Sequence, residues 1–343
     1  MILEALYQYY ERKAADPDPV RRLPAFGLED KEIPFIIELT AEGKPLGIVD
    51  TRHGEGKKKS ARRYLVPMGV KRSSGVAANL LWDTAEYVLG IERRDKRERV
   101  AEQHAVFRRR LSELPEAARL DAGIRAIEAF YANDGPAELV SDPWWPEIVE
   151  GNPVLTFRLH GDGDLICQRP AVVRACQSQE KPVGSAMCLV TGEQAATARL
   201  HTAIKGVWGA QSSGATLVSF NLDAFSSFNK AQGDNAPISP YAAFAYTTAV
   251  NHLLDRNSRQ RVQVGDASTV FWAQREDADV ETAFAAIFGD SDDPDARTEL
   301  VRGLLSAVQT GQFGGGRGEN RFYVLGLAPN AARVSVRFWH AAP

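Results

Sequence analysis

The stretch YLVPMGVKRSSGVAANLLWDTAEYVLG, residues 64–90, predicts a strand that runs into a basic loop and then directly into a helix. The strand is the apolar start of the segment, the loop is KRSSG at 71–75, and the helix is expected over 79–89. A strand, a polar loop and a helix in such close succession favour a mixed fold. The loop also belongs to the most basic part of the chain.

Residues 52–72 carry a local concentration of positive charge. The chain as a whole has a net charge of −3, so these cations are not a general background. Lysines at this density, beside Gly54 and Gly56, face water or a polyanion, and a phosphate backbone is the commonest polyanion. The only acid in the segment is Glu55. The basic residues are Arg52, Lys57, Lys58, Lys59, Arg62, Arg63, Lys71 and Arg72.

The composition is that of a soluble globular protein. The 343 residues can bury a sizeable core and form two or more domains, and 44% hydrophobic with 25% charged residues is ordinary. No apolar run approaches the roughly 18 residues of a membrane span, and no secretion signal is visible. The three cysteines form no C-x-x-C pair, which argues against a disulfide framework or a zinc site. We therefore expect a cytoplasmic protein.

Periodicity and turn residues predict an α+β fold, mainly antiparallel hairpins with peripheral helices. Ser239 followed by Pro240 has the pattern of a helix N-cap, opening a helix to about residue 254. Further helices are expected at 2–15, 79–89, 95–111, 116–131, 280–288 and 294–309. Hairpins are expected within 31–50, 155–168, 260–272 and 322–339, and strand-like segments at 187–190 and 216–221. A sub-boundary is expected near 132–153.

Three loops combine small residues with hydrogen-bond donors, as close approach to a nucleic acid requires. In the first, residues 71–75, glycine and serine let the backbone approach phosphate, the cations neutralise it, and the expected helix at Asn79 adds exposed N–H groups. The alternative is an ordinary basic loop between a strand and a helix.

The second loop, residues 205–214, reads KGVWGAQSSG. Its glutamine and serines both donate and accept hydrogen bonds, so they could read groove edges. Trp208 could insert as a wedge at a base step, although a tryptophan between glycines is more often a core residue.

The third loop, residues 228–237, is rich in amides and is expected to be exposed. It is either a candidate contact for nucleic acid or a simple connection before the helix that Ser239 caps. Asp234 argues against direct contact with phosphate and for contact with a base or a protein.

Two further charged segments are predicted to be ordinary solvent-exposed surface. The arginines of 93–110 alternate with Glu92, Asp95, Glu98 and Glu102, as on a solvated helix face, with Arg108–Arg110 left as a possible nonspecific DNA track. The acidic run at 290–295 lacks the glycine and glutamate of a calcium loop.

Local signatures of catalysis are absent. The glycine-rich segment 311–318 lacks the lysine and hydroxyl of a phosphate-binding loop, and neither a His-Glu-x-x-His nor a G-x-S-x-G motif occurs. We expect no catalytic residues, no metal and no cofactor.

Several stretches, taken in order, resemble the large subunit of the type I-C CRISPR surveillance complex (Cascade), the Csd-type family. Besides residues 64–90, they are MILEALYQYY at 1–10, CLVTGE at 188–193, HTAIKGVWGAQSSG at 201–214, TLVSFNLDAFSSFNKAQGDNAPIS at 216–239 and QVGDASTVFWA at 263–273. The match is weak between about 96 and 153. Members of the family continue into a helical C-terminal region that nothing here resembles, so the chain is expected to be the N-terminal part of a longer protein.

The resemblance implies a subunit without catalytic activity. It would inspect duplex DNA for a protospacer-adjacent motif (PAM), promote unwinding and R-loop formation, and help to recruit the helicase-nuclease. Its implied partners are the 5′ handle of the guide RNA, target double-stranded DNA, the handle-binding and backbone subunits, the small subunit and the helicase-nuclease. Phage anti-CRISPR proteins are further candidate partners, and no membrane is implied.

The loops then receive roles. The residues expected at the PAM are Lys71, Arg72, Ser73, Ser74, Asn79, Lys205, Gln211, Ser212 and Ser213, with Trp208 as a candidate wedge. Those expected to hold nucleic acid without sequence preference are Lys57, Lys58, Lys59, Arg62, Arg63, Asn229, Lys230, Gln232 and Asn235. Two alternatives remain: a general DNA-binding module, or a structural scaffold that docks guide RNA and neighbouring subunits.

Overall fold

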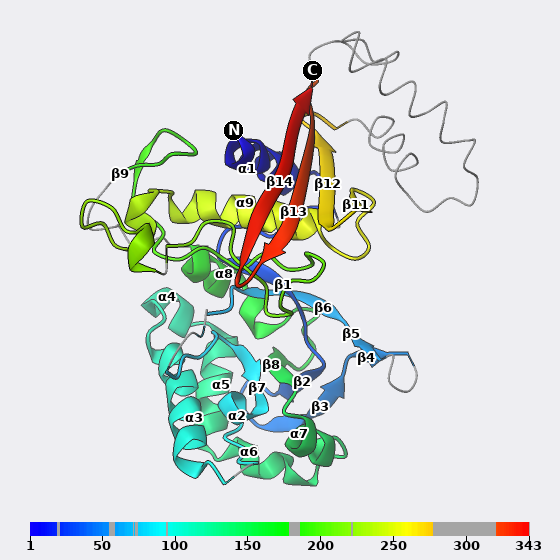
Figure 1. Cartoon of the computed structure of the whole chain (residues 1–343). Coiled ribbons are helices and arrows are strands. Elements are labelled where there is room, and N and C mark those ends of the chain that lie inside the picture. Colours follow the sequence, from blue (N-terminus) through cyan, green and yellow to red (C-terminus); the bar gives the residue numbers. More distant parts are fainter. Residues whose placement is uncertain are drawn as a thin grey trace. The chain divides into compact units, whose positions relative to one another are not determined.

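The computed structural model describes residues 1–18, 21–54, 59–70, 72, 75–93, 95–177, 186–220, 222–276 and 320–342. The chain divides into two units. Unit 1 comprises Met1–Leu23 and Lys181–Pro343, and unit 2 comprises Pro24–Glu180. The range 132–153, where the sequence predicts a sub-boundary, lies inside unit 2. Figure 1 shows the elements of each unit in sequence colours.

Unit 2 is built around a four-stranded sheet in the order β3-β2-β8-β7. Strands β2 (Phe35–Leu39) and β3 (Pro45–Asp50) form the predicted hairpin. Strand β8 (Val154–Leu159) pairs parallel with β2, and β7 (Trp82–Thr84) pairs antiparallel with β8. The central strands β2 and β8 carry the apolar residues of the core.

Helices and two-stranded ribbons complete unit 2. The helices are α2 (Ala85–Val88), α3 (Arg97–Ser112), α4 (Glu116–Arg119), α5 (Ala122–Ala132), α6 (Gly135–Glu138), η2 (Leu139–Ser141), α7 (Trp145–Gly151), η3 (Ile166–Gln168) and α8 (Pro170–Gln177). Two antiparallel ribbons pair β1 (Leu28–Glu32) with β6 (Arg63–Pro67) and β4 (Arg52–His53) with β5 (Ser60–Ala61). The β4–β5 ribbon encloses the most basic residues of the sequence.

Unit 1 contains an antiparallel sheet in the order β11-β12-β13-β14, next to two helices (Figure 1). Its strands are β11 (Arg261–Val264), β12 (Ala267–Ala273), β13 (Phe322–Asn330) and β14 (Arg333–Ala342). Helices α1 (Ile2–Ala14) and α9 (Pro240–Leu253) pack together through edge-on aromatic contacts such as Tyr10 with Phe244. The smaller elements are β9 (Ala186–Met187), β10 (Gln194–Ala195), η4 (Asp223–Phe225) and η5 (Gln232–Asn235).

Strand β12 shows why this sheet is stable. All of its residues are buried, as expected for a central strand with paired neighbours on both sides. Trp272 packs against Tyr9 of α1 and Tyr323 of β13, so helix and sheet share one aromatic core. Among the described residues, no helix combines the length and apolar character needed to cross a membrane.

The α+β class and most elements are as predicted. The N-cap at Ser239 is confirmed, because its hydroxyl accepts the Ala242 N–H at 3.1 Å. The hairpins at 31–50, 260–272 and 322–339 and the first helix are also confirmed. The helices predicted at 280–288 and 294–309 lie outside the described residues.

Five local predictions are wrong. The strand predicted at 187–190 does not form, because β9 ends at Met187 and the chain then turns through residues 189 and 190. The helix predicted at 79–89 is limited to α2 at its end, and Leu81 at φ +66° and strand β7 precede it, because pairing with β8 prevails over local helical spacing. The hairpin at 155–168 does not form, since both edges of β8 are occupied by β2 and β7. The helix at 116–131 is divided where Asp121 caps α5. The segment 216–220 makes one isolated bridge rather than a strand.

Candidate nucleic-acid interface

The basic segment 52–72 lies in unit 2, along the β4–β5 ribbon and the start of β6. The side chains of Lys59, Arg62 and Arg63 are exposed. Arg62 lies over the Tyr64 ring, 5.2 Å from its centroid, and Arg63 is opposite Glu32 in the β1–β6 register. These three cations are therefore available to a polyanion. The predicted residues Lys57, Lys58, Lys71, Ser73 and Ser74 lie outside the described residues.

Arg52 has a different role from its basic neighbours. Its guanidinium binds both carboxylate oxygens of Asp50 at 2.8 Å and also pairs with Glu147. It lies 4.4 Å from the centroid of Phe35 and 5.5 Å from that of Trp144. With its charge neutralised and its faces covered, Arg52 anchors the base of the β4–β5 ribbon rather than offering a free cation.

This anchor gives an expected dependence of stability on pH. The hydrogen bond from Arg52 holds the pKa of Asp50 below its ordinary value of 3.8. A carboxyl whose folded pKa is depressed stabilises the fold above its unfolded pKa, and this stability is lost as the pH falls through the folded pKa. Asp50→Asn should therefore lower the free energy of unfolding by about 2 kcal/mol at pH 7.

At pH 3, below the ordinary pKa of 3.8, the same substitution should cost less than at pH 7, because the unfolded chain takes up a proton at Asp50 before the folded protein does. Urea unfolding followed by circular dichroism at both pH values measures the difference. Equal losses at pH 7 and pH 3 would contradict the role of the ion pair. Glu32→Gln, which changes a carboxylate of unit 2 on a different strand, is the control.

Arg72 is also committed to a partner within unit 2. It pairs with Asp83, donates to the Ala77 carbonyl oxygen at 2.7 Å, and lies 4.2 Å from the centroid of Tyr87. Asp83 is 1% exposed and accepts the backbone N–H groups of Asn79 at 2.9 Å and Thr84 at 2.8 Å. Burial raises the pKa of Asp83, while these N–H groups and Arg72 oppose that rise.

Asn79 is buried and joins the residues on either side of the 71–75 loop. Its side-chain oxygen accepts the Val70 N–H at 2.9 Å, and the residue is 6% exposed. The prediction that a helix begins at Asn79 is wrong, so its N–H is not an exposed helix terminus; Asp83 accepts it instead. The network formed by Arg72, Asn79 and Asp83 fixes both ends of the 71–75 loop. We call it the Asp83 clasp.

The 205–214 loop is closed and anchored within unit 1. Ile204 and Ala215 exchange backbone hydrogen bonds of 2.8 and 2.9 Å at its base. Asn251 of α9 accepts the Lys205 N–H at 2.8 Å, and Ser268 of β12 accepts the Trp208 N–H at 2.8 Å. Gly214 has φ +88°, and a Cβ there would lie 2.8 Å from the Ile204 oxygen. The loop is thus held by two elements of the unit 1 core.

The outer side of this loop is polar with one exposed indole. The Val207 side chain is buried, at 5% exposed, whereas that of Trp208 is 62% exposed. Trp208 is therefore not a core residue, against the usual tendency of a tryptophan between glycines. The side chains predicted for the PAM in this loop are likewise exposed, namely Lys205, Gln211, Ser212 and Ser213. Gln211 also donates to the Gly214 carbonyl oxygen at 2.9 Å.

The 228–237 loop uses its amides internally. The Asn235 side chain accepts the Ser227 N–H at 2.9 Å and donates to the Lys230 and Gln232 carbonyl oxygens at 3.0 Å. The Gln232 side chain accepts Arg199 at 2.7 Å. Only Asn229 and Lys230 of the four residues predicted here have exposed side chains, while those of Gln232 and Asn235 are half-buried.

The CLVTGE segment at 188–193 supports α9. Cys188 and Glu193 close a turn through a 2.8 Å backbone bond, and Leu189 N–H donates to the Pro237 oxygen at 2.9 Å. The Cys188 thiol accepts the N–H of Ser239 at 3.3 Å. Burial raises the pKa of Cys188, but hydrogen bonds from Thr191 and Ser239 outweigh it and lower the value to about 7. The segment thus positions the helix cap.

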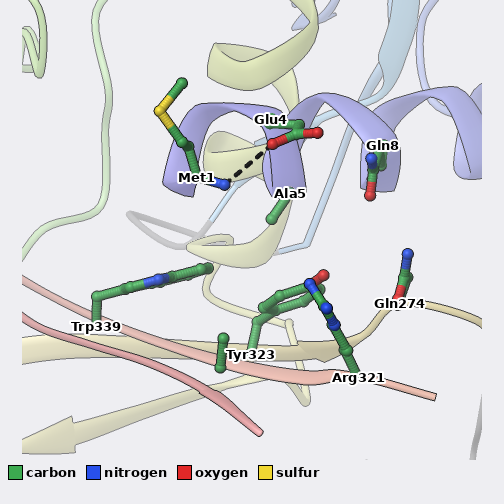
Figure 2. Close-up of a pocket in the computed structure, with 9 residues that line it drawn as sticks. Met1, Glu4, Ala5, Gln8, Gln274, Arg321, Tyr323 and Trp339 are labelled. Carbon is green, nitrogen blue, oxygen red and sulfur yellow. Dashed lines mark hydrogen bonds and ion pairs between the residues drawn. The ribbon is translucent and has the colours of Figure 1, made fainter. Parts of the chain in front are cut away.

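A small cavity lies in unit 1 between α1 and the sheet (Figure 2). The stacked rings of Tyr323 and Trp339, with centroids 5.4 Å apart, form part of its wall, and the Met1 amine pairs with Glu4 at its rim. Its volume is about 120 Å³. That is well below the roughly 300 Å³ at which small-molecule sites begin. Its lining is Met1, Glu4, Ala5, Gln8, Gln274, Arg321, Tyr323, Trp339 and Ala341.

Metal-binding chemistry has no evident centre in the part of the chain that the structure describes, where no three histidine, cysteine, aspartate or glutamate residues form a group. The strongest features are instead the loop at 205–214 and the cations of the β4–β5 ribbon. Sequence reasoning missed Asn251 and Ser268, which hold the 205–214 loop, and Asp83, which holds Arg72. Asn251 and Ser268 are far along the chain from their partners, and Asp83 is one polar residue within the 64–90 segment. No local signal in the sequence therefore marks them.

The family model described as CRISPR-associated protein (Cas_Csd1) matches residues 6–343, nearly the whole chain. No curated protein matches the chain.

Proposed function

Because the chain belongs to the CRISPR-associated Csd1 family, the large subunit of the type I-C surveillance complex, we propose that it recognises the PAM in duplex DNA. The family match identifies the chain as a subunit of a type I-C Cascade. In such complexes the guide RNA reads the long target by base pairing, and protein side chains read only a short duplex motif.

The observation that carries the proposal is the anchored loop at 205–214. A reading element must hold its donors in a defined register, and this loop is closed at its base and tied to α9 and β12. Gln211, Ser212 and Ser213 then offer donors and acceptors to base edges, and Lys205 offers a charge to phosphate. Trp208 is the side chain that could wedge into a base step and begin strand separation.

The exposed cations of unit 2 have a supporting role in the proposal. Lys59, Arg62 and Arg63 would hold a phosphate backbone without sequence preference, as we also propose for Lys57 and Lys58. Arg72 and Asn79 contribute indirectly, since their polar groups are occupied in the Asp83 clasp. They would shape the loop that carries Lys71, Ser73 and Ser74, whose proposed contact with the PAM rests on the sequence.

The remaining steps follow from the same premise and are also proposals. After motif recognition the subunit would promote R-loop formation and help to recruit the separate helicase-nuclease, without catalysing a reaction itself. It would lie beside the guide 5′ handle, the handle-binding and backbone subunits and the small subunit. The family match supports its assembly with other Cascade subunits.

The test is target-duplex binding by the reconstituted guide complex, with and without this chain, on correct and scrambled PAMs. We expect the chain to confer salt-sensitive binding that depends on the motif. Equal strengthening of both duplexes would instead identify a nonspecific clamp or scaffold. Binding by the chain alone, with no gain from guide RNA, would identify a general DNA-binding module.

Single substitutions test which side chains recognise the PAM. Gln211→Ala and Lys71→Ala should each reduce discrimination between correct and scrambled motifs by roughly tenfold, since one base contact is worth about 1–3 kcal/mol. Arg62→Ala, as the matched control, should weaken both duplexes evenly and reduce the salt slope by about one unit. If discrimination survives both reader substitutions, the PAM is read elsewhere.

A further inference from the structure

Phe228 is the most exposed large apolar side chain of the described internal residues, at 92%. It is in the left-handed region, with φ +50°, and the next residue, Asn229, follows at φ +57°. Bulky residues rarely adopt this conformation, because their Cβ approaches the following carbonyl oxygen. An aromatic ring held outward by an unfavourable backbone conformation calls for a functional explanation.

The loop around Phe228 is locked in this conformation. The three Asn235 hydrogen bonds, at 2.9, 3.0 and 3.0 Å, tie together Ser227, Lys230 and Gln232. Gly233 lies so close to the backbone of Ala198 that a Cβ at position 233 would come within 2.1 Å of the Ala198 oxygen. The ring is thus presented on a pre-organised support, which lowers the entropy lost when a partner binds.

The surroundings of Phe228 favour a protein partner over a nucleic acid. Within 222–235 two carboxylates, Asp223 and Asp234, accompany one lysine, Lys230. The two arginines that contact the segment are engaged, Arg199 with the Gln232 side chain and Arg333 with the Phe225 ring. With Lys230 as its one cation, the segment 222–235 offers little attraction to a phosphate backbone. The same segment also exposes Leu222 at 54% and Phe225 at 38%, which gives the apolar composition of a protein contact.

We propose that Phe228 is a docking anchor that inserts into an apolar socket on a neighbouring protein subunit of the surveillance complex. The proposal rests on membership of that complex and not on PAM reading by the 205–214 loop. Buried aromatic side chains dominate the energy of such interfaces, especially when they are rigid before binding. The Asn235 side-chain amide then serves to hold the anchor, which explains why its hydrogen bonds are made within the loop.

The test uses Phe228→Asn, which removes the ring but suits φ +50° because asparagine tolerates the left-handed region. The affinity of the chain for the guide complex assembled without it should fall at least tenfold. Target-duplex binding, measured with the chain at saturating concentration, should be unchanged. The unfolding free energy of the isolated chain should not decrease, which separates lost docking from lost folding.

Two further variants complete the design. Asn235→Ala keeps the ring but releases the loop, so assembly should weaken by a few fold. Val264→Asn replaces another exposed apolar residue of unit 1 and should leave assembly unchanged. The proposal is overturned if Phe228→Asn assembles normally, or if Val264→Asn weakens assembly equally. Normal assembly with weaker duplex binding would also overturn it and would identify Phe228 as a base-stacking residue.

Discussion

Asp83→Ala is expected to lower the free energy of unfolding of the chain by about 3 kcal/mol, because it removes a buried acceptor that serves several donors at once. The carboxylate has three partners: Arg72, and the N–H groups of Asn79 and Thr84. Removing it leaves at least the Asn79 N–H buried without its acceptor, and such a group costs its full desolvation penalty. The loop at 71–75 loses its fixed ends at the same time.

Urea unfolding of the wild type and of Asp83→Ala measures this loss. Arg72→Ala is the matched control and should cost less, because Asp83 keeps both backbone donors. A double-mutant cycle between the two positions should give a coupling well above that of an exposed ion pair, which is about 0.2–1 kcal/mol. Additive losses would mean that the two residues act independently and that no clasp exists.

Trp208→Ala is expected to weaken target-duplex binding by the assembled complex roughly tenfold to a hundredfold, the usual value of one stacked or inserted aromatic ring. The ring is 62% exposed, so the substitution removes little packing within unit 1. The backbone anchor remains, because the hydrogen bond to Ser268 is made by the main-chain N–H. The loss should therefore concern DNA and not folding.

The site of the loss can be resolved by using two DNA substrates. If Trp208 acts as a wedge, the substitution should impair a fully paired target much more than one already unpaired next to the PAM, because the second needs no strand separation. Ser268→Ala keeps the ring but removes the acceptor for its backbone, and should give a smaller loss. If Trp208→Ala weakens binding of the paired and the unpaired substrate by the same factor, or of neither, that result would falsify the wedge.

Local chemistry predicted those elements whose determinants are neighbours in the sequence. Ser239 and Pro240 mark the start of α9 because the cap is made with a residue three positions away. The hairpins at 31–50 and 260–272 form where turn residues separate two runs that alternate or are apolar. Residues 79–89 could not be predicted in this way, since β7 exists only through its pairing with β8, about 70 positions further along the chain.

The candidate interface shows the same division. The sequence located the basic segment and the polar loops, because charge and small donors are properties of composition. It could not separate free cations from committed ones. Arg52 and Arg63 look alike in the sequence, but Arg52 is neutralised by Asp50 and by Glu147, 95 positions away. The same holds for Trp208, whose anchor Ser268 is 60 positions distant.

The sequence by itself therefore determined the α+β class, the family and the loops that could meet a nucleic acid, since short-range patterns and composition suffice for each. Only the tertiary structure decided which side chains of those loops face outward. That choice depends on hydrogen bonds and burial contributed by distant segments, as Asp83 does for Arg72 and Ser268 for Trp208. A side chain's availability is a property of its partners, and those partners are brought to it only by the fold.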